Sequence, residues 1–197
     1  MRARLLLVLR YLLTMKNARC RHPLLSFIVV ALGAISAPVW AVDSASNAPA
    51  AMRLASDERA FMKEAAESGL YEVEAAKLAA TRAQLPEVKK YAGMTLTDHT
   101  AANRQLQALA KSKSFDGLPA KMSDKQEAFV ASLSGQSGVA FDAAYIRQAG
   151  IEDHKAAVKA YATAARSSRD KDLKMWAAKT LPVLERHLAA AEAIRLP

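Results

Sequence analysis

Residues 86–110, PEVKKYAGMTLTDHTAANRQLQALA, decide how this chain folds. Pro86 suits the first turn of a helix, where a missing N–H group costs nothing. Apolar and small side chains then recur every three or four residues, which places them on one helical face. The members of this stripe are Val88, Ala92, Thr95, His99, Ala102, Leu106 and Leu109. The stripe must be buried against other helices, so the imidazole of His99 is expected inside the packing.

Three further segments carry stripes of the same kind. The first begins near Asp57, with Ser56 or Asp57 as the expected helix cap, and continues to residue 80. The third covers about residues 141–166, and the fourth follows a short loop at residues 167–170. Because the loops within each pair are short, the paired helices are expected to be antiparallel.

A longer connection separates the two pairs. Ser123 and Gln126 have the spacing of a capping box and predict a short helix within this connection. The sequence therefore predicts an all-α fold, an antiparallel four-helix bundle over residues 57–195. A short extra helix is expected in the crossover between helices two and three.

The N-terminal segment has the order of a secretory signal peptide. Basic residues precede an uncharged run at residues 24–37, and the run is followed by Pro38, Val39, Trp40 and the small residue Ala41, after which we place the cleavage. The run is too short to cross a membrane comfortably, which disfavours a retained anchor. We expect residues 1–41 to be removed, with Met15 as an alternative start of translation. Residues 42–56, rich in Ala, Ser, Asn and Pro, are expected to form a flexible lead.

The net charge of +9 belongs largely to this signal. Residues 1–41 hold six of the 28 Lys and Arg and none of the 19 acids, so the rest of the chain carries +3. This balance argues against nucleic acid as a partner. We expect no stable transmembrane span after signal removal, and an envelope protein or a second copy as partner. Cys20 leaves with the signal, so no thiol remains for a disulfide or for nucleophilic attack.

Each predicted helix offers one candidate metal ligand on its inward face. These residues are Glu72, His99, His154 and His187. Imidazole and carboxylate groups that meet inside a bundle suit iron, copper or zinc. Asp98, Tyr145 and Tyr161 are placed around these ligands, whereas Tyr91 and Trp176 are expected to be core residues. Gly150, one turn before His154, predicts close packing or a local distortion there.

Two interpretations of these four residues remain open. The Glu-x-x-His pattern of carboxylate-bridged di-iron sites is absent, which favours a single metal ion or a hydrogen-bonded histidine cluster without metal. No phosphate-binding loop, nucleophile motif or paired cysteine motif occurs in the sequence. The sequence therefore favours a protein that is not an enzyme, with a redox enzyme as a third interpretation.

A set of short motifs resembles one protein family. They are Asp57-x-x-x-Phe61, Gly69-x-x-Glu72, Asp98-His99, Phe141-Asp142-x-x-Tyr145, His154 and Leu181-Pro182-x-x-x-x-His187-Leu188. Together they resemble the secreted bacterial family called domain of unknown function 4142, over about residues 57–193. The resemblance implies a ferritin-like helical bundle in an exported protein, often labelled an outer-membrane protein. The family has no established reaction.

The leading hypothesis is thus a periplasmic helical bundle, outer-membrane association included, that binds a transition metal in metal handling or stress protection. The alternative is a non-enzymatic structural or interaction module of the cell envelope. In that case the histidines and Glu72 would form a packing network.

Overall fold

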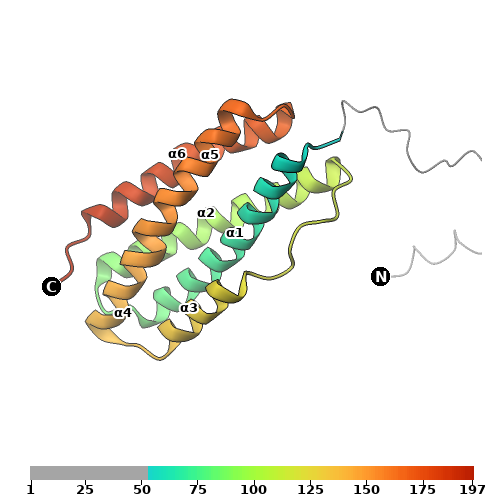
Figure 1. The fold of residues 1–197 in the computed structure, drawn as a ribbon. Helices are drawn as coiled ribbons and strands as arrows, with labels where there is room; N and C mark the ends of the chain where they lie inside the picture. The colour runs from blue at the N-terminus through green and yellow to red at the C-terminus, as the bar shows by residue number, and fades with distance from the viewer. Residues whose placement is uncertain (1–52) are drawn as a thin grey trace, which may run out of the picture. The chain divides into compact units, whose positions relative to one another are not determined.

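The structure, a computed structural model, describes residues 53–197, and every regular element in this range is helical. The elements are α1 (Ser56–Arg82), α2 (Pro86–Ser112), α3 (Asp124–Ser134), α4 (Gly138–Tyr145), the π-helix η2 (Ile146–Glu152), α5 (Asp153–Ser167) and α6 (Lys171–Ala193). The predicted all-α class is confirmed (Figure 1). The predicted signal peptide and the lead up to residue 52 lie outside the described residues.

The two helix pairs are held together by a carboxylate at each end. Asp142 of α4 accepts hydrogen bonds from the backbone N–H groups of Gln84 and Leu85, between α1 and α2, at 3.0 and 2.8 Å. Glu58 of α1 accepts from the N–H groups of Arg169 and Asp170, between α5 and α6, at 2.7 and 2.9 Å. Each pair therefore supplies the acceptor that closes the loop of the other pair.

These contacts fix the directions of the helices. α4 begins beside the loop between α1 and α2, and α5 ends beside the N-terminus of α1, so α5 runs parallel to α2 and antiparallel to α1. Two parallel helices cannot be joined by a tight turn. Residues 113–137, which contain α3, make the long return along the outside of α1 (Figure 1).

The start of α1 differs from the sequence prediction. We expected Ser56 or Asp57 as the cap, but the N-cap residue is Ala55, whose methyl side chain cannot accept a hydrogen bond. The side chain of Glu58 accepts a hydrogen bond from the backbone N–H of Ala55 at 2.8 Å instead. One carboxylate thus serves both the start of α1 and the loop before α6, a role that local sequence cannot reveal.

The predicted short helix in the crossover is confirmed as α3. The hydroxyl of Ser123 accepts from the N–H of Gln126, and the side chain of Gln126 accepts from the N–H of Ser123 at 2.9 Å. This is the reciprocal pattern of a capping box. Phe129 packs against Tyr71 of α1 with ring centroids 6.1 Å apart, so α3 covers the side of α1.

The buried apolar residues form two clusters with polar residues between them. The first contains Val88, Phe141, Tyr145 and Ile146, and the second contains Met62, Leu106, Tyr161, Leu173 and Trp176. Along each long helical stretch, a buried polar residue lies between the two apolar sets: Glu72, His99, His154 and His187. A polar layer in the middle of a core must have its hydrogen bonds satisfied, so its contacts need a full account.

The third helical stretch contains the distortion that Gly150 predicts. Residues 146–152 form a π-helix between α4 and α5. Gly150 lies in this turn, and a Cβ atom added there would stand 3.0 Å from the Cβ of Ala191 on α6. The close approach of α6 favours glycine at this point, because a Cβ atom would fit only if α6 shifted slightly. Such π-turns occur often at functional sites, because they change the direction of the side chains that follow.

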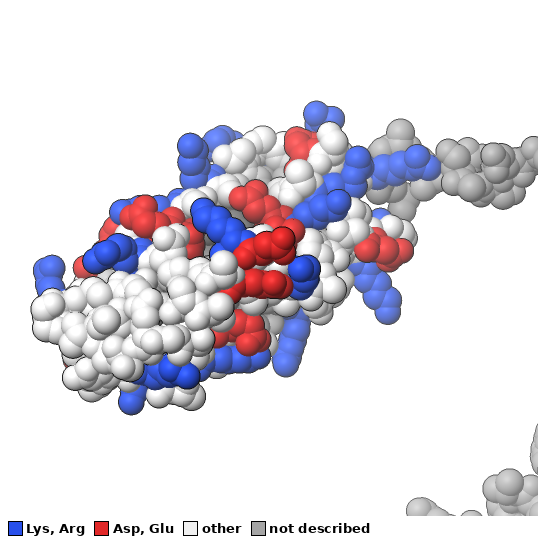
Figure 2. Space-filling view, turned by 60° about the horizontal axis from the view of Figure 1, so that its bottom comes forward, with Lys and Arg blue, Asp and Glu red and all other residues white. Residues whose placement is uncertain are grey.

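No helix between residues 53 and 197 has the length and hydrophobicity that a membrane crossing requires. Lys and Arg side chains are interspersed with Asp and Glu over much of the face shown in Figure 2. The interior polar layer needs an explanation of its own, because its polar groups are buried.

Candidate metal centre

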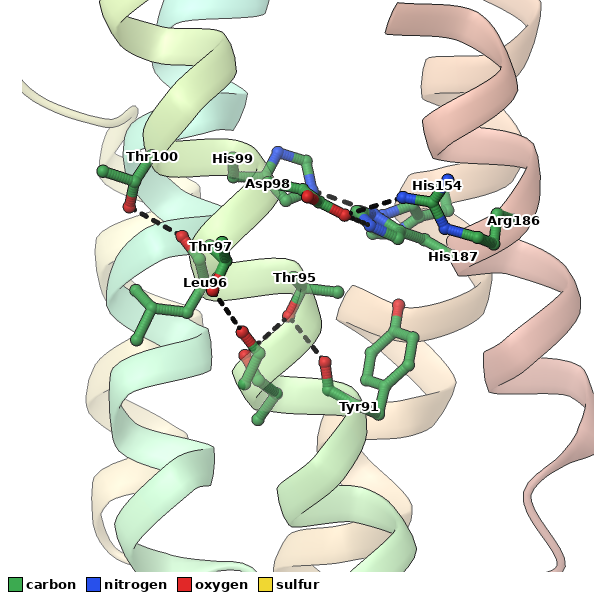
Figure 3. Close-up of polar contacts among 12 residues, drawn as sticks. Tyr91, Thr95, Leu96, Thr97, Asp98, His99, Thr100, His154, Arg186 and His187 are labelled. Atoms are coloured by element: carbon green, nitrogen blue, oxygen red, sulfur yellow. Dashed lines mark hydrogen bonds and ion pairs between the residues drawn. The ribbon is translucent and has the colours of Figure 1, made fainter.

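Three imidazole rings from three helices meet in the polar layer. The ring centroids of His99, His154 and His187 are 5.2–5.4 Å apart in every pair. Nε2 of His154 lies 3.4 Å from Nε2 of His99 and 3.2 Å from Nδ1 of His187. One nitrogen of each ring thus points to a common centre, with all three within 4.8 Å of one another and all three residues buried. Figure 3 shows this convergence from α2, α5 and α6.

The other nitrogens of His154 and His187 are held by acceptors. Nδ1 of His154 lies 2.7 Å from the carbonyl oxygen of Ala149, five residues earlier in the π-helix. Nε2 of His187 lies 2.9 Å from a carboxylate oxygen of Asp98 on α2. Because a carbonyl and a carboxylate can only accept, these two nitrogens carry the protons. An acceptor that fixes the tautomer of a histidine in this way is typical of metal sites.

The tautomers leave two lone pairs facing each other. A neutral imidazole has one protonated nitrogen, so Nε2 of His154 and Nδ1 of His187 are both without hydrogen. These two acceptors are 3.2 Å apart and buried. His99 can donate a hydrogen bond to Nε2 of His154, but the lone pair on Nδ1 of His187 then still has no donor. A cation, or a neutral hydrogen-bond donor, between the nitrogens would relieve this repulsion.

Burial disfavours an added proton on any of the three rings. Desolvation lowers the pKa of His99 well below its ordinary value, and the nearby His154 and His187 lower it further. Desolvation also lowers the pKa of His154 to about 4, against the opposing effect of its bond to Ala149. The pKa of His187 is lowered by burial, although Asp98 opposes the shift. All three rings are thus neutral ligands near pH 7.

Glu72 lies beside the cluster, on the outer side of His154. Its Oε1 is 3.8 Å from Nδ1 of His154, the nitrogen that already donates to Ala149. The side chain is buried, and its Oε2 has no hydrogen-bond partner among the described residues. Desolvation, together with the charge of Asp153, raises the pKa of Glu72 well above its ordinary value. The three imidazoles converge without this carboxylate.

Asp98, Tyr145 and Tyr161, which the sequence placed around the histidines, differ in how close they lie to the imidazole rings. Asp98 contacts His187 and also forms an ion pair of 2.9 Å with Arg186. Tyr145 makes its hydrogen bond with Thr95 and not with an imidazole, and the two hydroxyl oxygens are 3.3 Å apart. Tyr161 packs in the second apolar cluster, with its ring centroid 5.1 Å from that of Phe61. Of the three, Asp98 therefore makes the direct contact with a ligand.

Tyr91 is the residue near the site that sequence reasoning missed. We expected a core residue, and its ring does pack 6.4 and 6.5 Å from those of His154 and His187. Its hydroxyl points toward the imidazoles (Figure 3) and has no hydrogen-bond partner among the described residues. Burial raises the pKa of Tyr91, so the phenol keeps its proton. Its spacing of one turn from Thr95 and two from His99 was the available signal.

A cavity of about 230 Å³ adjoins the cluster on the side of α1 and α5. His99, His154 and Glu72 line its inner end, and Phe61 and Tyr161 line another part of its wall. This volume holds several water molecules. The histidine cluster is therefore accessible to small species from one side.

The sequence similarity of the chain extends over most of its length. Residues 43–194 match the family model described as Domain of unknown function (DUF4142). No curated protein and no solved structure matches the chain significantly. The motifs at His99, His154 and His187 lie within the matched range, which confirms the resemblance seen in the sequence, and the chain belongs to the DUF4142 family.

Proposed function

We propose that this protein binds one transition-metal ion through His99, His154 and His187. The observation that carries the proposal is the 3.2 Å separation of two unprotonated nitrogens, Nε2 of His154 and Nδ1 of His187. Two lone pairs repel each other at this distance, whereas a cation between them is attracted to both. Neutral imidazole nitrogen is a ligand that zinc, copper and iron all accept.

Two of the three nitrogen separations fit a tetrahedral ion, and all three nitrogens lie within 4.8 Å of one another. Zn–N bonds of about 2.0–2.1 Å at tetrahedral angles give neighbouring ligand nitrogens a separation of about 3.3–3.4 Å. The two separations that involve His154 are 3.2 and 3.4 Å. Three histidines leave a fourth coordination position free for water or another small ligand. The hydroxyl of Tyr91 is a neighbouring group that could hydrogen-bond to such a ligand.

We further propose that the fold is a ferritin-like four-helix bundle that acts in the periplasm. Parallel α2 and α5, joined by a long crossover, are the connection found in ferritin-like folds. Export rests on the signal-like order of basic, apolar and small residues before residue 42. A buried metal site in an exported protein suits metal handling or protection against metal stress, and outer-membrane association is part of this proposal.

The test is metal content after purification and after exposure to Zn²⁺, Cu²⁺ or Fe²⁺. We expect about one ion per chain by elemental analysis, and a higher melting temperature on loading. His154→Ala and His99→Leu should lose the ion, and His99→Leu also keeps the interior filled. Thr95→Val is the matched control, because Thr95 is buried one turn from His99 and offers no imidazole.

A chain that binds none of these ions, with an unchanged melting temperature, contradicts the proposal. The packing-network alternative would then stand, and it expects His99→Leu to keep or raise stability, since an apolar replacement that fits can be neutral or better. Circular dichroism of each variant separates loss of the ion from loss of the fold.

Asp98→Asn is expected to weaken metal binding by about 10- to 100-fold. The carboxylate of Asp98 accepts the proton on Nε2 of His187 and so holds Nδ1 toward the centre. An amide at this position can accept the same bond but supplies no charge to make the ring more basic. Competition with a chromophoric chelator measures the change, and an affinity equal to that of the wild type would show that Asp98 does not orient His187.

A further inference from the structure

We infer that the cavity between α1 and α5 is the entrance through which a hydrated divalent cation reaches the three histidines, with Glu72 as the carboxylate that receives it. This inference rests on the proposed metal site. The cavity of about 230 Å³ reaches His99 and His154. It also adjoins a more open groove of about 520 Å³, with which it shares Phe61, Glu64, Ala156 and Ala160.

Oxygen atoms line this cavity at increasing depth along α1. Glu64, Ser68 and Glu72 are four residues apart, so they lie on one helical face at steps of about 6 Å. Glu64 is exposed, Ser68 is half-buried and Glu72 is buried, and all three line the cavity. A cation moving inward therefore finds an oxygen atom at each turn of the helix. The opposite wall includes the small residues Ala156, Ala157 and Ala160 of α5.

The charges of the cavity wall favour cations. Glu64 and Asp153 supply carboxylates to it, Glu72 adds a buried carboxyl group, and none of its lining residues in the described chain is Lys or Arg. A cleft lined by charges of one sign concentrates ions of the opposite sign and raises their association rate. The other side of the cluster is different, because the guanidinium of Arg186 lies 2.9 Å from Asp98 and repels an approaching cation.

Glu72 supplies the second, independent observation. Only 4% of the residue is exposed, yet its Oε2 lacks a hydrogen-bond partner among the described residues. A buried polar atom without a partner costs free energy, which a bound cation would recover. Its Oε1 lies 3.8 Å from Nδ1 of His154, so a cation at Glu72 is next to the histidine cluster.

The rate of Co²⁺ uptake tests this inference. Metal-free protein is mixed with Co²⁺ at low ionic strength, and the visible absorption of the bound ion is followed by stopped flow. Glu64→Gln and Glu72→Gln should each slow uptake by about three- to tenfold. A group that assists the passage of the ion but does not hold it at its final site changes uptake and release by the same factor. Release should therefore slow equally, and the dissociation constant should change by less than about twofold. Glu74→Gln is the matched control, since Glu74 is exposed on α1, pairs with Lys77 and does not line the cavity.

A second variant changes the size of the entrance and leaves its charge unaltered. Ala156→Phe fills part of the cavity and should also slow both uptake and release, whereas Ala101→Phe, at an exposed position of α2, should not. If the wild type binds Co²⁺ but Glu64→Gln and Ala156→Phe take it up as fast as their controls, the cavity is not the entrance, and the proposed metal site is unaffected. If Glu72→Gln weakens equilibrium binding by much more than twofold, Glu72 is a ligand, which overturns its assigned role. If the wild type takes up no Co²⁺, the proposed function itself fails.

Discussion

Asp142→Ala is expected to lower the free energy of unfolding by about 3 kcal/mol. The buried carboxylate of Asp142 accepts from two backbone N–H groups, those of Gln84 and Leu85, at the N-terminus of α2. Alanine would leave both donors without their charged acceptor and would open a space between α4 and the loop. Helix N-termini are also stabilised by negative charge, so the loss includes the interaction with the dipole of α2. Urea unfolding, followed by circular dichroism, measures the effect.

Two further variants make this measurement specific. Asp142→Asn retains an oxygen that can accept one bond, so it should lose less than the alanine variant. Asp116→Ala removes an exposed aspartate from the connection between α2 and α3 and should change stability by less than about 0.5 kcal/mol. If Asp142→Ala unfolds at the same urea concentration as Asp116→Ala, the carboxylate does not hold the loop.

Acidification of the metal-free protein from pH 6.5 to pH 4 is expected to lower its free energy of unfolding by about 3 kcal/mol through protonation of His154 in the unfolded state. The pKa of His154 is about 4 in the folded chain, because burial disfavours the charged ring, and about 6.5 in the unfolded chain. Between these values the unfolded state binds a proton that the folded state does not, so stability falls as pH falls. The lowered pKa values of His99 and His187 act in the same direction, whereas the raised pKa of Glu72 acts in the opposite direction.

His154→Leu separates this effect from the protonation of carboxylates. The leucine variant keeps an apolar side chain in the core but has no ring to protonate, so its stability should depend less on pH between 6.5 and 4. The comparison requires a chelator, because a bound metal ion also competes with protons for the nitrogens. An equal pH dependence of the wild type and His154→Leu would show that the His154 ring is not buried as a neutral group.

The long helices and their inward faces could be predicted from the sequence, because their stripes repeat over many turns. Pro86 and the stripe from Val88 to Leu106 correspond closely to α2. The capping box of Ser123 and Gln126 was equally local and was also predicted. The cap of α1 was not, since Glu58 is drawn toward Arg169, more than a hundred residues away in sequence.

The convergence of three histidines could be proposed from the stripes, but not their contacts. The π-helix shifts the register before His154 and frees the carbonyl of Ala149 to accept its proton, and a helical period of 3.6 residues contains no sign of this. The position of Glu72 outside the ring of nitrogens depends on how far α1 and α5 stand apart, which the sequence does not specify. Tyr91 resembled an ordinary core residue for the same reason.

The exchange of loop-closing carboxylates between the two helix pairs bears on how the domain comes apart. Neither pair has the acceptor for its own loop, because Asp142 belongs to one and Glu58 to the other. A half of the domain that detached would leave exposed backbone donors behind in both halves. Partial opening is thereby disfavoured, and unfolding should occur in one cooperative step rather than one hairpin at a time.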